Sequence, residues 1–265
     1  MESPLDRRAF LRSGVAAVAF APGQLRESAP TNAAPDQFPL QDPALVREMV
    51  TVAHGNIDRV RELLRQHPAL AEATVDWGFG DWETALGAAC HTGRREIAEL
   101  LLASGAAPTI FSAAMLGQLD LVRAFVSTMP GIQRTYGPHS ITLLAHGRAG
   151  GEPAVAVRAY LESLGDADTP PPTISQSDEE RQRFVGRYAH GENRDQPIDV
   201  RVDRGGLVIG RPDGTVRLLR AVRADEFYPV GAESVRVRFV VAGGQARELT
   251  VLDPEPILTA VRVSS

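Results

Sequence analysis

Lysine is absent from the sequence, so all 28 basic residues are arginines. This absence excludes Schiff-base catalysis by lysine and the phosphate-binding lysine of a P-loop. Cysteine is nearly absent, and the single Cys90 excludes an intrachain disulfide and any zinc site built from several cysteines. We therefore expect stability to come from packing, with Cys90 as a buried and inert thiol.

The net charge is −5 and the sequence pI is near 5.7, so no basic field is available to hold a nucleic-acid backbone. The composition is 43% hydrophobic and 23% charged, which is ordinary for a globular protein and argues against wholesale disorder. A length of 265 residues predicts about two domains. Two packed units and no nucleic-acid partner are expected.

Residues 1–23 have the pattern of an export signal. Arg7 and Arg8 precede a Phe-Leu pair, and an apolar stretch at residues 15–21 is too short to span a bilayer. The segment resembles a twin-arginine signal, which implies a periplasmic or secreted protein without a stable membrane span. The alternative is a cytoplasmic protein that happens to begin with arginines and alanines. Residues 24–43 are rich in Pro, Ala, Ser and Asn, and we expect a disordered linker there.

A repeated pattern of helix, glycine and helix organises residues 44–165. Its clearest copy, residues 84–106, reads TALGAACHTGRREIAELLLASGA and resembles the ankyrin repeat. In such a repeat Thr84 caps the first helix, Gly93 turns the chain between the helices, and Gly105 ends the second helix. Weaker copies lie at residues 52–64, 113–126 and 142–164.

The copies are unequally spaced, which predicts long connectors at residues 68–83 and 130–141 and almost none between the second and third copies. One helix pair cannot bury its apolar face alone, whereas four can form a stable stack. Phrases at residues 80–84, 113–120 and 137–144 are similar to a bacterial ankyrin-repeat family without an assigned activity. That resemblance implies an α-solenoid with a binding role and supplies no catalytic residues.

Residues 166–176 contain three consecutive prolines and are predicted to be a linker. Beyond it, at residues 177–265, alternating apolar residues and regular turn signals predict seven or eight strands in an antiparallel barrel or curled sandwich. The fold class is therefore a mixed α and β multidomain protein. The order of residues 184–188, 225–228 and 237–239 is similar to a lipocalin-like domain appended to β-lactamase-like hydrolases, which implies an accessory role.

Candidate catalytic residues are few, because no serine lies in a G-x-S-x-G or S-x-x-K motif. His54 and His91 occupy equivalent places near turn glycines, and we interpret them as capping or packing residues. His139, His146 and Glu152 do not form a zinc-protease pattern. We predict no enzyme activity, no metal and no cofactor; the alternative is an unrecognised hydrolase with its site between the domains.

The long connectors carry the candidate partner-binding residues, since aromatic side chains dominate binding energetics. These candidates are Trp77, Phe79, Asp81, Trp82, Tyr136 and His139. The alternative for the aromatic residues is that they fold back over the first repeat. We predict an exported module that binds a protein or peptide on the concave ankyrin surface, and the alternative is a small apolar ligand inside the C-terminal barrel.

Overall fold

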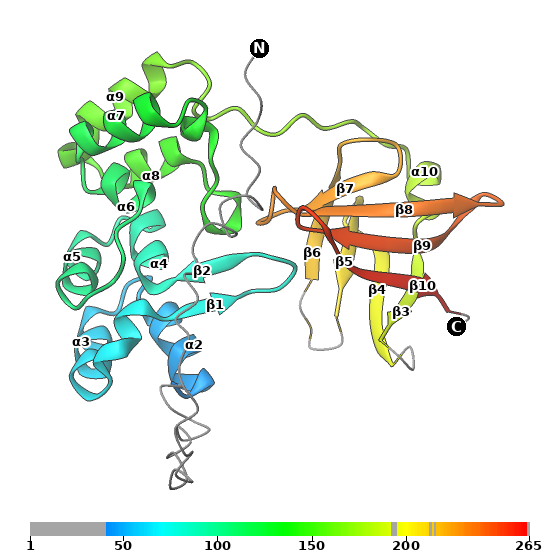
Figure 1. Cartoon of the computed structure of the whole chain (residues 1–265), viewed down its shortest axis with the longest axis horizontal. Coiled ribbons are helices and arrows are strands. Elements are labelled where there is room, and N and C mark those ends of the chain that lie inside the picture. The colour runs from blue at the N-terminus through cyan, green and yellow to red at the C-terminus, as the bar shows by residue number, and fades with distance from the viewer. Residues whose placement is uncertain (1–40, 192–194, 212–213, 215, 264–265) are drawn as a thin grey trace, which may run out of the picture. The chain divides into compact units, whose positions relative to one another are not determined.

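The computed structural model describes residues 41–191, 195–211, 214 and 216–263 (Figure 1). The predicted export signal, and the predicted linker up to residue 40, lie outside these ranges. The chain from Gln41 onward forms one compact unit, in which helices are followed by strands. Within the described ranges, no helix is both long and apolar enough to cross a bilayer.

The helices form four antiparallel pairs, which confirms the predicted row of helix, glycine and helix units. The pairs are α2 (Pro43–Val52) with α3 (Ile57–Gln66), α4 (Ala85–His91) with α5 (Arg95–Ala103), α6 (Ile110–Met115) with α7 (Leu119–Thr128), and α8 (Leu143–Ala149) with α9 (Val155–Ser163).

Threonine caps recur at the start of the first helix in the last three pairs. The hydroxyls of Thr84, Thr109 and Thr142 accept hydrogen bonds from backbone N–H groups three residues later. Each hydroxyl satisfies a donor that the helix leaves unpaired at its N-terminus. The cap predicted for Thr84 is therefore confirmed. Thr109 and Thr142 form the same cap at the equivalent positions of the next two repeats.

The connectors differ in length as the sequence predicts. The first long connector contains the 3₁₀ turn η1 (Pro68–Glu72) and a hairpin of β1 (Thr74–Asp76) with β2 (Trp82–Thr84). The second contains the turns η2 (Ile132–Arg134) and η3 (Pro138–Ser140), whereas α5 leads almost directly into α6. A further turn, η4 (Glu152–Ala154), precedes α9.

The apolar core of the helical repeats runs along the stack because small side chains let neighbouring pairs approach. Ala88, Ala89 and Cys90 on α4 are fully buried, among leucines and valines from the adjacent helices. Burial raises the pKa of Cys90 to about 12, which keeps the thiol protonated and agrees with the expected inert cysteine.

The strands form a closed antiparallel barrel, in which each strand pairs with its neighbour in sequence and β10 returns to β3. Its strands are β3 (Gly186–His190), β4 (Gln196–Asp203), β5 (Gly206–Gly210), β6 (Val216–Ala221), β7 (Glu226–Pro229), β8 (Arg236–Ala242), β9 (Gln245–Leu252) and β10 (Pro256–Arg262). A short helix, α10 (Asp178–Gln182), precedes it. The sequence therefore predicted the strands, and the structure selects the barrel over the curled sandwich.

Four aromatic side chains occupy the barrel interior. Phe184, Tyr188, Phe227 and Phe239 are at most 1% exposed, and the ring centroids of neighbouring pairs among them lie 4.9–5.8 Å apart. Such contacts between aromatic rings stabilise a core beyond the area that they bury. Because these rings take up the interior, the barrel is built around a packed core.

Gly93 provides a test of how tightly the repeats pack. Its φ is +69°, and an added Cβ would lie 2.4 Å from the backbone oxygen of Ala149. Gly105 also has a positive φ but open space around it, so Gly105→Ala measures the conformational cost alone, about 1–2 kcal/mol. We expect Gly93→Ala to lower the free energy of unfolding by about 1–3 kcal/mol more, measured by urea denaturation. Equal losses for the two variants would contradict the close approach.

Candidate metal centre

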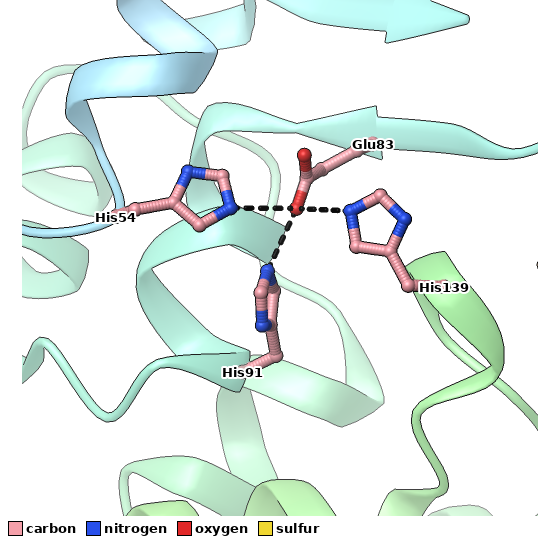
Figure 2. A group of neighbouring side chains, drawn as sticks. All are labelled: His54, Glu83, His91 and His139. Atoms are coloured by element: carbon pink, nitrogen blue, oxygen red, sulfur yellow. Dashed lines mark hydrogen bonds and ion pairs between the residues drawn. The ribbon is translucent and has the colours of Figure 1, made fainter. Parts of the chain in front are cut away.

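Four side chains from three separate segments of the helical repeats converge on one point, as Figure 2 shows. His54 follows α2, Glu83 lies on β2, His91 is the last residue of α4, and His139 lies in η3. One ligand atom from each residue lies within 4.8 Å of every other. Three imidazoles and one carboxylate are a ligand set suited to a transition-metal ion.

Repetition of the helix pair places His54 beside His91. Both residues lie near the end of the first helix of their pair, and stacking of the pairs brings the ring centroids to 5.0 Å. The Nδ1 atom of His54 lies 3.0 Å from the carbonyl oxygen of Val50. Because a carbonyl can only accept, this nitrogen carries the proton, and the ring presents its Nε2 atom to the cluster.

Glu83 is held at the centre of the cluster by the connector hairpin. Its side chain has no exposed surface, although it lies on a short strand paired with β1. The indole Nε1–H of Trp77 donates to Oε2 of Glu83 at 2.7 Å. That hydrogen bond fixes one carboxylate oxygen and directs the other, Oε1, toward the three histidines.

Asp81 fixes the orientation of His139. The Nδ1–H and the backbone N–H of His139 donate to the two carboxylate oxygens of Asp81, at 2.8 and 2.9 Å. His139 adopts a left-handed backbone with φ 59°, which is a strained conformation for a residue with a side chain. Asp81 is only 2% exposed, so it acts as a buried partner of the kind that orients metal-bound histidines.

Three imidazole nitrogens surround one carboxylate oxygen of Glu83. Its Oε1 atom lies 2.8 Å from Nε2 of His91, 3.4 Å from Nε2 of His139 and 3.5 Å from Nε2 of His54. In neutral His54 the Nδ1 atom holds the only proton, so its Nε2 lone pair faces a carboxylate oxygen. Such an arrangement is repulsive unless protons or a cation lie between these atoms.

The electrostatics of the cluster in the absence of an ion show how strongly these groups interact. Burial alone would raise the pKa of the Glu83 carboxyl, but hydrogen bonds from His139, His91 and Trp77 together lower it to about 2. Hydrogen bonds to Asp81 and Glu83 raise the pKa of His139 to about 9, although burial opposes this shift. The carboxylate therefore stays ionised at neutral pH, as a metal ligand must.

The spacing of the ligand atoms also fits a bound ion. A tetrahedral ion with bonds of about 2.05 Å holds its ligand atoms about 3.3 Å apart. Two distances from Oε1 of Glu83, to His139 and His54, are 3.4 and 3.5 Å, while the third, to His91, is 2.8 Å. Two of the three spacings around Oε1 of Glu83 therefore match those of a first-row transition-metal site, and the contact with His91 would have to lengthen.

The structure places the predicted partner-binding residues in different environments. Phe79 is 5% exposed and packs with barrel residues, and Asp81 is buried in the histidine cluster. Trp77 is half-buried beside Glu83, and the hydroxyl of Tyr136 donates to the Thr169 carbonyl at 2.7 Å. Trp82 alone among the six is well exposed, at 61%. His139 belongs to the cluster described above.

The sequence patterns do not reveal this cluster. His54 and His91 were interpreted as capping or packing residues, and the Nδ1 contact of His54 agrees in part with that interpretation. His146 and Glu152, considered with His139, lie outside the group: His146 is buried with its ring centroid 6.5 Å from that of His91, and Glu152 is exposed. The available signal was the recurrence of histidine at equivalent places in successive repeats, together with a first connector that carries Glu72, Asp76, Asp81 and Glu83.

Comparison with known proteins supports the repeat assignment. The family model described as "Ankyrin repeat" matches residues 81–113, which span Glu83, His91 and the second helix pair. A search of curated proteins gives no match to the chain. The match includes two of the four clustered side chains and therefore places half of the cluster within one repeat.

His146 gives the helical repeats a specific dependence on pH. It is fully buried, its Nδ1 atom is 2.8 Å from the carbonyl oxygen of Thr142, and burial lowers its pKa to about 4 despite that hydrogen bond. A lowered histidine pKa favours the neutral form in the folded state. The stability that neutral His146 contributes is therefore complete above pH 6.5 and is lost as the pH falls toward 4. Between these limits we expect a loss of about 3 kcal/mol in unfolding free energy.

The measurement compares urea denaturation of the wild type and His146→Gln at several pH values between 7 and 4. The variant should lose stability less steeply on acidification, because glutamine does not titrate in this range. The same slope for both proteins would show that His146 does not titrate as described.

Proposed function

We propose that this protein binds a divalent transition-metal ion through His54, Glu83, His91 and His139. The observation that carries the proposal is the position of Oε1 of Glu83, which faces three imidazole Nε2 atoms at 2.8–3.5 Å. A carboxylate oxygen has too few lone pairs to accept a hydrogen bond from all three nitrogens with good geometry. A cation at the common point turns all four atoms into ligands and removes their repulsion.

The ligand types indicate the class of metal. Imidazole nitrogen suits zinc, copper, iron and nickel, whereas magnesium and calcium prefer sites built entirely of oxygen. The carboxylate of Glu83 offsets one of the two positive charges, and Asp81 accepts a hydrogen bond from Nδ1 of His139 and so orients its ring. Zinc is the reference ion for the proposal, and Co²⁺ is its spectroscopic substitute.

Ion binding by the full chain tests this proposal directly. We expect one Co²⁺ or Zn²⁺ per chain by elemental analysis and calorimetric titration. His91→Ala should weaken binding by at least about 100-fold, because it removes a ligand. Asp81→Asn should weaken binding by about 10–100-fold, since it removes only the acceptor that orients His139.

His67→Ala is the matched control, because His67 lies in the same helical region but outside the cluster. It should bind the ion with wild-type affinity. Circular dichroism of each variant, recorded without metal, separates the loss of a ligand from the loss of the fold. Equal affinity in His67→Ala and His91→Ala, or no stoichiometric binding by the wild type, would refute the metal centre.

We propose protein or peptide binding as a second function, because the ankyrin match is to a repeat that commonly mediates protein interactions. The specific observation in its favour is Trp82, which is 61% exposed and lines a groove of ≈ 660 Å³. Phe111, Tyr136 and Pro138 also line this groove. Export by the twin-arginine-like segment is part of this proposal, and the partner would then be periplasmic or extracellular.

Affinity capture from a periplasmic extract tests the second function. Trp82→Ala should reduce the captured partner by about tenfold or more, as expected for a central aromatic anchor. Leu121→Ala is the matched control, because Leu121 is a large apolar residue that is 50% exposed on α7. If the two variants capture the same proteins in the same amounts, Trp82 is not the anchor.

The other two candidate functions have less support. A small apolar ligand inside the barrel would have to displace the aromatic side chains that occupy its interior. A hydrolase would need a nucleophile in reach of a base, and Ser140, the serine that follows His139, instead donates to the carboxylate of Glu233. The proposal therefore assigns binding and no reaction.

A further inference from the structure

We infer that an ion at this centre keeps a coordination position open to a small molecule that carries an oxyanion, such as a carboxylate or a phosphate. This inference rests on the proposed metal centre. It rests in addition on a recess beside the centre, on a charged side chain that also lines this recess, and on the balance of charge around it.

A recess with a volume of ≈ 610 Å³ lies against the cluster. His54, Glu83 and His139 form one side of it, and the side chains of His54 and His139 are 34% and 35% exposed. His91, whose side chain is 10% exposed, does not line it. An ion held by all four residues is therefore covered on the side of His91 and accessible from the recess. Small-molecule sites occupy roughly 300–1,000 Å³, so the recess can hold more than a water molecule.

Arg217, on β6, lines the same recess. One of its terminal nitrogens donates to the carbonyl oxygen of Trp77 at 2.7 Å and to Oδ2 of Asp81 at 3.0 Å. These bonds hold the guanidinium in place and leave its Nε–H buried with no hydrogen-bond partner among the described residues. The side chain is nonetheless 21% exposed, so its positive charge can attract an oxyanion in the recess.

The charges around the recess favour an anion. With neutral histidines, the two carboxylates of Glu83 and Asp81 balance the ion, and Arg217 then leaves one positive charge in excess. The guanidinium of Arg47 adds to this excess, since it lies 5.1 Å from the ring of Trp77, another residue of the recess wall. A monoanionic ligand restores neutrality, with one oxygen on the ion and another turned toward Arg217.

Coordination chemistry allows such a ligand. Zinc and its first-row neighbours expand from four to five or six ligands when an oxygen donor can approach. The apolar surfaces of Trp77 and Val216 line the recess beside the charged groups. The ligand we infer is therefore an oxyanion attached to a short organic group, with the bare anion as its minimal form.

The test uses the full chain loaded with Co²⁺, whose visible absorption changes with coordination number. Acetate and inorganic phosphate, titrated separately against chloride at equal ionic strength, distinguish a carboxylate ligand from a phosphate ligand. We expect a saturable spectral change with at least one of the two anions. Arg217→Gln should weaken binding of that anion by about tenfold or more, measured on variant protein that still binds one Co²⁺ per chain. Arg220→Gln, at an exposed position on the same strand, should behave as the wild type.

The outcomes separate this inference from the proposed function. Stoichiometric Co²⁺ binding with no spectral response to either anion would overturn the open position and leave the metal centre intact. An anion response that is unchanged in Arg217→Gln, with thermal unfolding showing the variant folded, would overturn the role of Arg217. Failure of the wild type to bind Co²⁺ would overturn both.

Discussion

The burial of the Glu83 carboxylate is the constraint on which the site depends. A carboxylate with no exposed surface loses its hydration and has to recover that free energy from neighbouring donors or a cation. Trp77 satisfies one oxygen, and three histidines surround the other. The groups around Glu83 therefore offset this one buried charge, and a divalent ion would neutralise it more completely than hydrogen bonds alone.

Asp81 extends the same electrostatic network beyond the cluster. It accepts hydrogen bonds from His139 and from Arg217, so a single buried carboxylate joins the second connector, the connector hairpin and strand β6. Phe79, from the same hairpin, packs with the barrel core. The hairpin thus supports the site and also packs against the barrel core. This double role explains why most of its aromatic residues are not exposed.

The repeat architecture supplies the stiffness that the site requires. Successive helix pairs repeat the same backbone geometry, so His54 and His91 come to lie side by side without any additional structure. Glu83 and His139 come from the connectors, where insertions are tolerated and function commonly resides. The stack therefore provides two of the clustered side chains, and the two long connectors provide the other two.

The sequence by itself determined the helix pairs, their threonine and glycine boundaries, the connector lengths and the strands, because these features depend on local periodicity, capping and turn chemistry. It also indicated that Cys90 is buried. The convergence of His54, Glu83, His91 and His139 was decided only by the tertiary structure, since it depends on how far each pair is displaced from the next and on the direction in which the connectors fold back. The buried positions of Phe79 and Asp81 were also decided by the tertiary structure, because no local sequence pattern indicates which surface a connector packs against.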